Sequence, residues 1–204
     1  MRILVSSDIH GNVDLLEKLK EKAKDVNLVL YCGDIAKNPS SSEAQRQDLD
    51  NLIATFDEID AECRFIRGNC DNFETDSKYF LKREESFGDV RIVPFEDILT
   101  TPFGTFREVS EEQIERDLEG IHGGNAIILA HQPPFGAGDD VGKGVHVGSK
   151  AILNWIEREN PLYWLCGHVH EGNGEYEVGG TKVVNAAADS SGNELREYIF
   201  EIRS

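Results

Sequence analysis

The sequence has few cysteines, no long apolar run and few basic residues. Its four cysteines show no C-x-x-C spacing, which excludes a structural zinc site built on closely spaced cysteine pairs. We expect reduced thiols, because Cys32 and Cys166 lie inside apolar runs where cysteine behaves as a small buried hydrophobe. The longest apolar runs, such as residues 126–130, fall far short of the ~18 residues of a membrane-spanning helix.

The N-terminus offers only Met1 and Arg2 before the first strand-like stretch. We therefore expect no signal peptide, a cytoplasmic protein and no membrane contact. A chain of 204 residues can bury a full core without disulfides, so we expect a single domain over residues 1–204. The oligomeric state is left open.

Basic residues are scarce: 21 Lys and Arg stand against 38 Asp and Glu, for a formal net charge of −17. Proteins that bind extended phosphate backbones carry basic patches with interleaved aromatics, and the longest basic concentration here, residues 18–24, alternates with acids on a predicted helix. We therefore expect no long nucleic acid as a partner. A small anionic substrate stays compatible, since two divalent cations would outweigh the carboxylates of Asp8 and Asp34.

Strand-like and helix-like segments alternate along most of the chain. Short buried strands are predicted at residues 2–7, 28–32, 63–67, 90–95, 126–130 and 162–166. Helices are predicted at residues 13–24 and 49–59, from the cap Ser110 to about Leu118, and from the cap Ser149 to the stop at Pro161. Residues 175–178, 182–185 and 197–202 predict three antiparallel strands, and the polar stretch 37–47 predicts a mobile loop. The alternation predicts an α/β fold.

Potential metal ligands directly follow five of the apolar runs. They are Asp8 with His10, then Asp34, Asn69 and His131, and finally His168 with His170. In open α/β sheets, sites form at the carboxyl ends of the strands, so the fold would gather these distant residues. Mixed oxygen and imidazole ligands suit divalent first-row transition metals, and a pair of such ions can hold a phosphate and generate the hydroxide that attacks it. The pattern predicts a two-metal hydrolase.

Glycine precedes three of these ligands, at Gly33, Gly68 and Gly167. A residue without a β-carbon permits tight turns and close backbone approach. The alternative, an ordinary turn at the end of a strand, explains each glycine equally well from the sequence alone.

Five ordered motifs resemble those of the calcineurin-like metallophosphoesterases. They are Asp8-Ile9-His10, Gly33-Asp34, Gly68-Asn69-Cys70-Asp71, Ala130-His131-Gln132-Pro133-Pro134 and Gly167-His168-Val169-His170. The similarity runs from about Arg2 to His170, and the segment from His146 to His168 looks most like a small prokaryotic branch of predicted phosphoesterases related to cyclic-nucleotide phosphodiesterases. The resemblance implies a four-layer α/β/β/α sandwich, with two mixed sheets flanked by helices.

The resemblance also implies a ligand set and an activity. One metal would take Asp8, His10 and His170, the other Asn69, His131 and His168, with Asp34 bridging. The implied activity is a metal-dependent phosphodiesterase that acts on small phosphodiesters or nucleotides through a dinuclear centre and a bridging hydroxide. For the two divalent ions we expect Mn²⁺, with Zn²⁺, Fe²⁺ and Ni²⁺ as alternatives. The competing hypothesis is a non-catalytic metal-binding scaffold with the same fold, and the intact ligand set argues against it.

Cys70 is a departure from the family pattern, because many members have a histidine there that assists the leaving group. A thiol can contact substrate but cannot supply a positive charge. We therefore expect Cys70 to border the substrate without replacing that histidine. Asp71 is a catalytic candidate as an acceptor for an imidazole proton, and the alternative is a solvated loop carboxylate.

His146 lies in a glycine-rich segment, residues 136–148, that follows His131. Loops at strand ends carry function more often than average, so His146 is a candidate to bind substrate and to protonate the leaving oxygen. The alternative is a loop histidine without substrate contact. His122, beside Gly123 and Gly124, is expected to be an exposed loop residue without chemistry.

Overall fold

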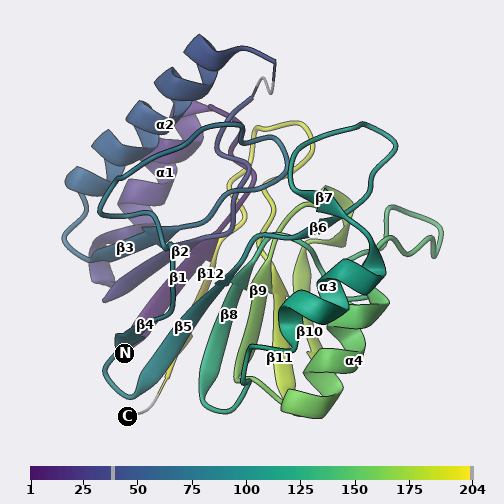
Figure 1. Ribbon diagram of the computed structural model, residues 1–204. Helices are drawn as coiled ribbons and strands as arrows, with labels where there is room; N and C mark the ends of the chain where they lie inside the picture. The colour runs from purple at the N-terminus through teal and green to yellow at the C-terminus, as the bar shows by residue number, and fades with distance from the viewer. Residues whose placement is uncertain (38–39, 203–204) are drawn as a thin grey trace.

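The computed structural model describes residues 1–37 and 40–202, which place two β-sheets face to face between two pairs of helices (Figure 1). Helices α1 (Val13–Lys22) and α2 (Ser42–Asp57) cover the outer face of the smaller sheet. Helices α3 (Glu111–Leu118) and α4 (Lys150–Glu159) cover the larger sheet. The predicted four-layer α/β/β/α sandwich is confirmed.

The smaller sheet has the strand order β12-β1-β2-β3. Strands β1 (Arg2–Ser6), β2 (Leu28–Tyr31) and β3 (Glu62–Phe65) are parallel, and β12 (Tyr198–Glu201) runs antiparallel to β1. The prediction that the last three strands form one antiparallel group is therefore wrong for β12. Phe200 of β12 stacks on Tyr163 of the facing sheet, so contacts distant in sequence place this strand.

The larger sheet has the order β10-β11-β9-β8-β5-β4 and is mixed. Four central strands are parallel, namely β5 (Val90–Phe95), β8 (Ala126–Ala130), β9 (Tyr163–Cys166) and β11 (Thr181–Asn185). The edge strands β4 (Glu85–Phe87) and β10 (Gly174–Val178) are antiparallel to their neighbours. A small separate ladder pairs β6 (Ile98–Leu99) with β7 (Glu108–Val109). Strands β4, β6 and β7 were not predicted, because they are too short to show a period.

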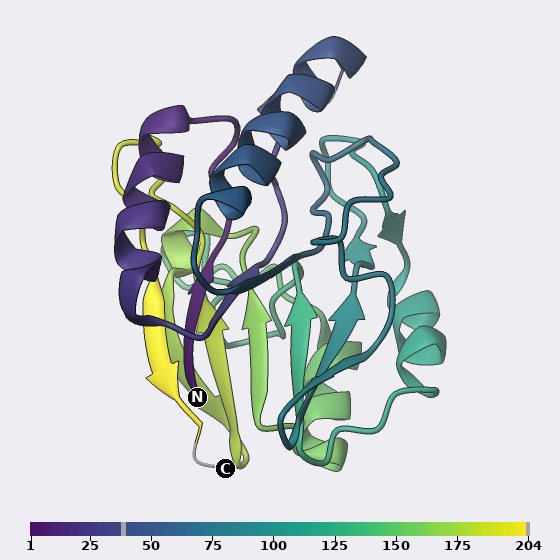
Figure 2. The same cartoon turned by 90° about the vertical axis from the view of Figure 1, so that its left-hand side faces the viewer.

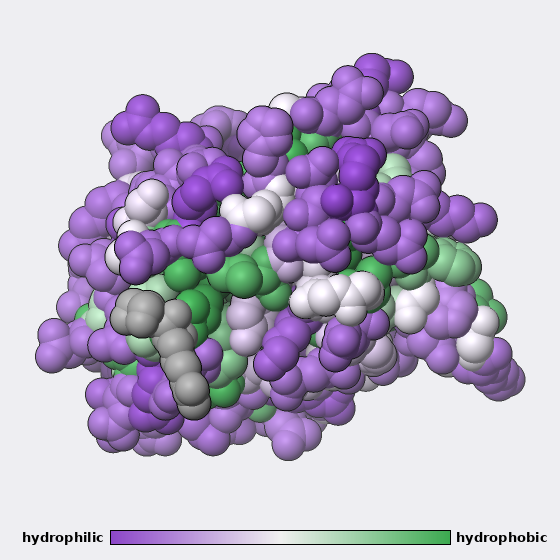
Figure 3. Space-filling view, turned by 90° about the horizontal axis from the view of Figure 1, so that it is seen from below, coloured by the Kyte–Doolittle hydropathy of each residue, from purple (hydrophilic) through white to green (hydrophobic). Residues whose placement is uncertain are grey.

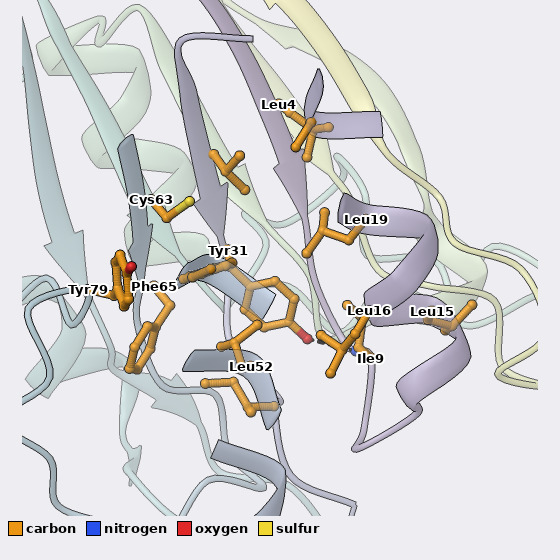
Figure 4. Close-up of a cluster of buried hydrophobic side chains, with 14 of the residues drawn as sticks. Leu4, Ile9, Leu15, Leu16, Leu19, Tyr31, Leu52, Cys63, Phe65 and Tyr79 are labelled. Atoms are coloured by element: carbon orange, nitrogen blue, oxygen red, sulfur yellow. Dashed lines mark hydrogen bonds between the residues drawn. The ribbon is translucent and has the colours of Figure 1, made fainter. Parts of the chain in front are cut away.

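The continuous apolar runs of β1 and β2 are explained by burial on both faces. Ile3 and Leu28 point into the middle layer between the sheets, whereas Leu4 and Val29 point outward to the helices. Figure 4 shows this outer cluster, in which the ring of Tyr31 lies among leucines of α1 and α2.

Helices α3 and α4 begin where their caps predict. Ser110 accepts a hydrogen bond from the backbone N–H of Gln113, and Ser149 accepts one from that of Ile152. Helix α1 is followed by a 3₁₀ turn (η1, Ala23–Asp25), and a second turn (η2, His170–Gly172) follows β9. Helix α4 ends at Glu159, and its C-cap Asn160 directly precedes Pro161.

Helix α2 begins seven residues earlier than predicted, so residues 42–47 of the expected mobile loop are helical, while residues 38–39 lie outside the described part. Gln45 explains the difference. It is buried and donates to the carbonyl of Cys70 while accepting from the N–H of Asn72, so a polar side chain anchors this turn.

All parallel strands point toward the same end of the sandwich, away from Met1 and the end of β12 (Figure 2). At the opposite end, apolar side chains show between two hydrophilic margins (Figure 3). Within residues 1–37 and 40–202, none of the helices has the length and apolar character needed to cross a membrane.

Candidate metal centre

The seven predicted ligands lie at the carboxyl ends of five strands that belong to both sheets. Asp8, Asp34 and Asn69 follow β1, β2 and β3 of the smaller sheet. His131 follows β8 of the larger sheet, and His168 and His170 follow β9. The site therefore sits between the two sheets rather than along the edge of one.

Asp8, His10 and His170 form one group, whose ligand atoms all lie within 4.8 Å of one another. The Nε2 atoms of His10 and His170 lie 3.9 and 3.8 Å from Asp8 Oδ1. Atoms at this spacing are too far apart for hydrogen bonds and surround a space that a shared cation can fill.

Asn69, His131 and His168 form the second group. Asn69 Oδ1 lies 3.1 Å from His131 Nε2 and 2.8 Å from His168 Nδ1. Asp34 lies between the two groups, with Oδ1 3.6 Å from His131 Nε2 and Oδ2 3.8 Å from His10 Nε2. The two oxygens of one buried carboxylate thus face both groups, as a bridging ligand requires.

Backbone carbonyls orient three of the four imidazoles. The Nδ1 atoms of His10, His131 and His170 lie 3.2, 2.7 and 2.7 Å from the carbonyl oxygens of residues 36, 32 and 188. An Nδ1–H that donates to a carbonyl leaves the Nε2 lone pair free for a metal, and such contacts commonly support metal-binding histidines. His168 has the opposite orientation, with Nδ1 toward Asn69. The donor set therefore fits two divalent transition-metal ions.

Four of the ligands have left-handed backbone conformations. The φ angles of Asp8, His10, Asp34 and His168 are 60°, 49°, 56° and 71°. Such conformations cost non-glycine residues about 1–3 kcal/mol each and cluster at functional sites, where the surrounding structure holds them. The tight turns bring the ligand side chains inward directly after each strand.

The glycines that precede three ligands are required for close packing. A β-carbon at Gly68 would overlap the carboxylate of Asp34, and one at Gly167 would overlap the carboxylate of Asp8. Gly33 has φ +94°, and a β-carbon there would overlap the backbone of Gly68. Of the two explanations that the sequence left open, close approach is the one the structure supports.

Burial and neighbouring charges shift the pKa values of His131 and His168 in opposite directions. Burial lowers the pKa of His131, but the carboxylates of Asp34 and Asp8 outweigh it and raise that pKa to about 9. Burial, followed by the charge on His131, lowers the pKa of His168 to about 4. Before metal binding, His131 therefore carries a proton at neutral pH that an incoming cation must displace.

Asp71 does not make the contact expected from the sequence. Its buried carboxylate accepts hydrogen bonds from the backbone N–H groups of Gly68 and Ala36, at 2.9 and 2.8 Å. The Nδ1 atoms of the four ligand histidines face carbonyls or Asn69 instead. A carboxylate at this position fixes the loop that carries Asn69. Burial, with the charge of Asp34, raises the pKa of Asp71 to about 6. A catalytic role for Asp71 stays a prediction.

Cys70 borders the centre. Its sulfur, Asp34 and His10 lie within 4.8 Å of one another, and its backbone N–H donates to Asp34 Oδ1 at 2.7 Å. Burial, with the charge of Asp34, raises the pKa of the Cys70 thiol far above its usual range. Before metal binding, the side chain is therefore an uncharged thiol beside the ligands.

His146 lies on the loop after β8, and its side chain is 35% exposed. Its Nδ1 lies 2.7 Å from Asp139 Oδ1, and the buried Asp139 also accepts from the N–H of Gly148. Among the described residues, the polar partner of His146 is thus Asp139 rather than any of the seven ligands. His122 is exposed, as expected.

Sequence reasoning missed the residues that hold Asn69 in place. Asn69 Nδ2 donates to Thr105 Oγ1 at 2.9 Å, and Thr105 donates onward to the carboxylate of Glu108. The guanidinium of Arg107 donates to the carbonyls of Gly68 and Asp71. These residues lie more than thirty positions from Asn69 in a segment without periodicity, so no local pattern indicated them.

Two hollows flank the cluster. One, of about 400 Å³, is lined by Asp8, His10 and His170 together with Lys37 and residues 189–193. The other, of about 510 Å³, lies beside His168 and is lined mainly by apolar side chains. The centre is thus open on two sides of different polarity.

The four-layer fold and this cluster of ligands define a metal-dependent phosphoesterase. The sequence profile of the calcineurin-like phosphoesterases matches residues 1–172, and the chain belongs to this family, whose members hold a dinuclear divalent metal centre. The resemblance inferred from the five motifs is confirmed.

Individual proteins are similar over most of the chain. An uncharacterized protein of Methanocaldococcus jannaschii is 29% identical over 203 residues, which cover 93% of this chain and 89% of that protein. A crystal structure from Thermus thermophilus superposes with a TM-score of 0.61 at 15% identity over 99% of both chains. A dimetal phosphatase from Danio rerio gives a TM-score of 0.61 at 14% identity, over 93% of this chain and 87% of that one. At these identities the two structures show the fold alone.

Proposed function

We propose that this protein hydrolyses small phosphate esters, and phosphodiesters in preference to monoesters. The observation that carries the proposal is the placement of Asp34, whose two carboxylate oxygens face the two groups of ligands. The hollows on both sides of the cluster support the preference for diesters, because a diester has an organic group on each side of its phosphorus. A non-catalytic scaffold would not need all seven ligands together.

Two divalent transition-metal ions, when bound, would supply Lewis-acid activation of the phosphate and a water nucleophile. We propose that Asp8, His10 and His170 hold one ion, that Asn69, His131 and His168 hold the other, and that Asp34 bridges them. Asn69 adds an oxygen ligand without a further negative charge, which preserves the positive field that a phosphate needs. Cys70, whose sulfur lies beside Asp34 and His10, is proposed to border the substrate.

His146 is the proposed donor of a proton to the leaving oxygen. The Asp139 carboxylate orients its Nδ1, so Nε2 is the atom that can carry the proton to be transferred. General acid help is worth about 10²- to 10⁴-fold. His146→Ala should therefore slow the hydrolysis of esters of poorly acidic alcohols far more than that of nitrophenyl esters. Cys70→His should partly restore hydrolysis of the esters of poorly acidic alcohols. The measurement is log rate against leaving-group pKa, and an equal loss on all esters would assign His146 a binding role only.

The natural partner is proposed to be a small phosphate ester rather than a long nucleic acid. A net charge of −17 around a cationic centre repels an extended phosphate backbone but admits a small anion. Cleavage of small diesters should therefore depend weakly on salt. Cleavage of long DNA at the same rate as small diesters would contradict this.

The experiment that tests the proposed function uses metal-stripped protein reloaded with Mn²⁺, Zn²⁺, Ni²⁺ or Fe²⁺. Each form is assayed with 4-nitrophenyl phosphate, bis(4-nitrophenyl) phosphate and a panel of nucleotides. We expect activity only after reloading, highest with Mn²⁺ and higher on the bis-ester than on the monoester. Absence of hydrolysis with every metal would overturn the proposed function, and a preference for monoesters would overturn the diester assignment.

A further inference from the structure

Two loops rise above the carboxyl ends of the larger sheet (Figure 1), and residues from both line the hollow beside His168. One loop leads from β6 to β7 and, with Leu99 at the end of β6, contributes residues 99–103. The other follows β8 and contributes Val141 and Val147. The cavity has a volume of about 510 Å³, within the range of about 300–1,000 Å³ typical of small-molecule sites. It touches a proposed metal ligand but contains none of the other six.

The cavity wall is apolar, and three of its side chains are unusually exposed. Phe103 is 81% exposed, Val141 44% and Val147 39%. Exposed apolar side chains around one concave surface are typical of a ligand-binding site. Leu99, Pro102 and Val169 complete the apolar lining.

The charges of the lining exclude a second phosphate or a carboxylate as the occupant. Among the described residues that line the cavity there is no lysine or arginine, and Glu171 adds an exposed carboxylate. The amide of Gln132 is already engaged, since its Oε1 accepts from the N–H of Leu99 and its Nε2 donates to the carbonyl of Val147. Together with the six apolar residues of the lining, this favours an uncharged occupant.

We propose that the cavity binds an uncharged aromatic group of the phosphate ester, of the size of a bicyclic ring, with Phe103 as the residue that contacts its face. This inference rests on the proposed function and deepens it. A phosphate held between the two groups of ligands would place one ester substituent toward His168, where the cavity opens. The substituent on the other side would meet the polar hollow that contains Lys37. The centre would thus select esters with one apolar and one polar organic group.

The test compares Phe103→Ala with Phe103→Tyr, which retains an aromatic face, and with Ile199→Ala, which truncates an exposed apolar side chain of β12. Naphthylphosphonate and methylphosphonate, whose C–P bonds resist hydrolysis, are titrated into the Mn²⁺-loaded proteins by calorimetry. The same proteins are assayed with naphthyl and methyl esters of 4-nitrophenyl phosphate.

We expect the parent to bind naphthylphosphonate about tenfold more tightly than methylphosphonate, since aromatic contact and apolar burial favour only the former. Phe103→Ala should remove most of this preference and raise KM for the naphthyl diester more than for the methyl diester, whose one aromatic ring is the leaving group. Phe103→Tyr and Ile199→Ala should resemble the parent.

Equal binding of the two phosphonates by the parent, or an unchanged preference in Phe103→Ala, would overturn the inference. Preferential binding of naphthylphosphonate without hydrolysis of either diester would overturn the proposed function and leave the aromatic site standing. Hydrolysis of both diesters with the same ratio of their kcat/KM values in Phe103→Ala as in the parent would leave the proposed function standing and overturn the aromatic site.

Discussion

Asn69 is held by Thr105: its side-chain Nδ2 donates a hydrogen bond to Thr105 Oγ1 at 2.9 Å. The hydroxyl of Thr105 in turn donates to Glu108. These two hydrogen bonds fix the orientation of the Asn69 amide. Its nitrogen donates to Thr105, and its oxygen lies toward His131 and His168. A residue outside the ligand set thus fixes the oxygen that a metal needs.

Thr105→Val should weaken the binding of one metal ion, because the nearly isosteric side chain cannot accept the hydrogen bond and the Asn69 amide becomes free to rotate. Loss of such a supporting contact typically costs about 10- to 100-fold in metal affinity or activity. Thr105→Ser, which keeps the hydroxyl, should remain close to the parent. Calorimetric titration of metal-stripped protein checks this, and equal affinities for Thr105→Val and the parent would show that Thr105 does not orient Asn69.

Gly167→Ala should disturb the ion held by Asp8. Its β-carbon would overlap the Asp8 carboxylate, which already accepts hydrogen bonds from the N–H of His168. Overpacking of this kind costs about 1–3 kcal/mol. Gly124→Ala is the matched control, because its β-carbon would meet open space. The midpoint of urea denaturation and the metal content should both fall for Gly167→Ala only. Parent-like values of both quantities for that variant would contradict the close approach of Gly167 to Asp8.

The pair formed by His146 and Asp139 should give a measurable pH dependence. The hydrogen bond that His146 Nδ1–H donates to Asp139, together with the charge of that carboxylate, raises the pKa of His146. A group whose pKa is raised by folding adds stability that is fully present below its unfolded pKa of about 6.5 and is lost as pH rises through the folded pKa. Asp139→Asn should therefore lower the His146 pKa in an NMR titration and destabilise the protein more at about pH 5.5 than at about pH 9. A destabilisation that is the same at both pH values would contradict this pairing.

Much of the layered fold could be predicted because its signals are local. Ser110 and Ser149 mark helix starts through hydrogen bonds to residues three positions away, and the apolar runs of β1 and β2 reflect burial on both faces. Strand β12 could not be placed in this way, since its neighbours are β1 and, through Phe200, Tyr163 of the other sheet. The start of α2 was missed because the buried side chain that anchors it, Gln45, is polar.

In the candidate site, too, the features with a local sequence signal could be predicted and the contacts between distant residues could not. Its seven ligands directly follow strands, so their order in the sequence indicated that they would converge. The supporting contacts were not predictable, because Thr105 reaches Asn69 across 36 positions and the imidazoles are held by carbonyls that any residue type supplies. The carboxylate of Asp71 accepts hydrogen bonds from backbone N–H groups, which no side-chain pattern indicates, and its catalytic role stays a prediction.

The most direct test of the dinuclear centre is the metal content of Asp34→Asn. The Asp34 carboxylate faces both ligand groups, so its replacement by a neutral amide should lower the occupancy of both ions together. After reloading with Mn²⁺, elemental analysis should find about two ions per chain in the parent and in the control His122→Ala. Asp34→Asn should hold well under one ion per chain and lose hydrolysis of bis(4-nitrophenyl) phosphate by orders of magnitude. Parent-like metal content and activity in Asp34→Asn would contradict the account.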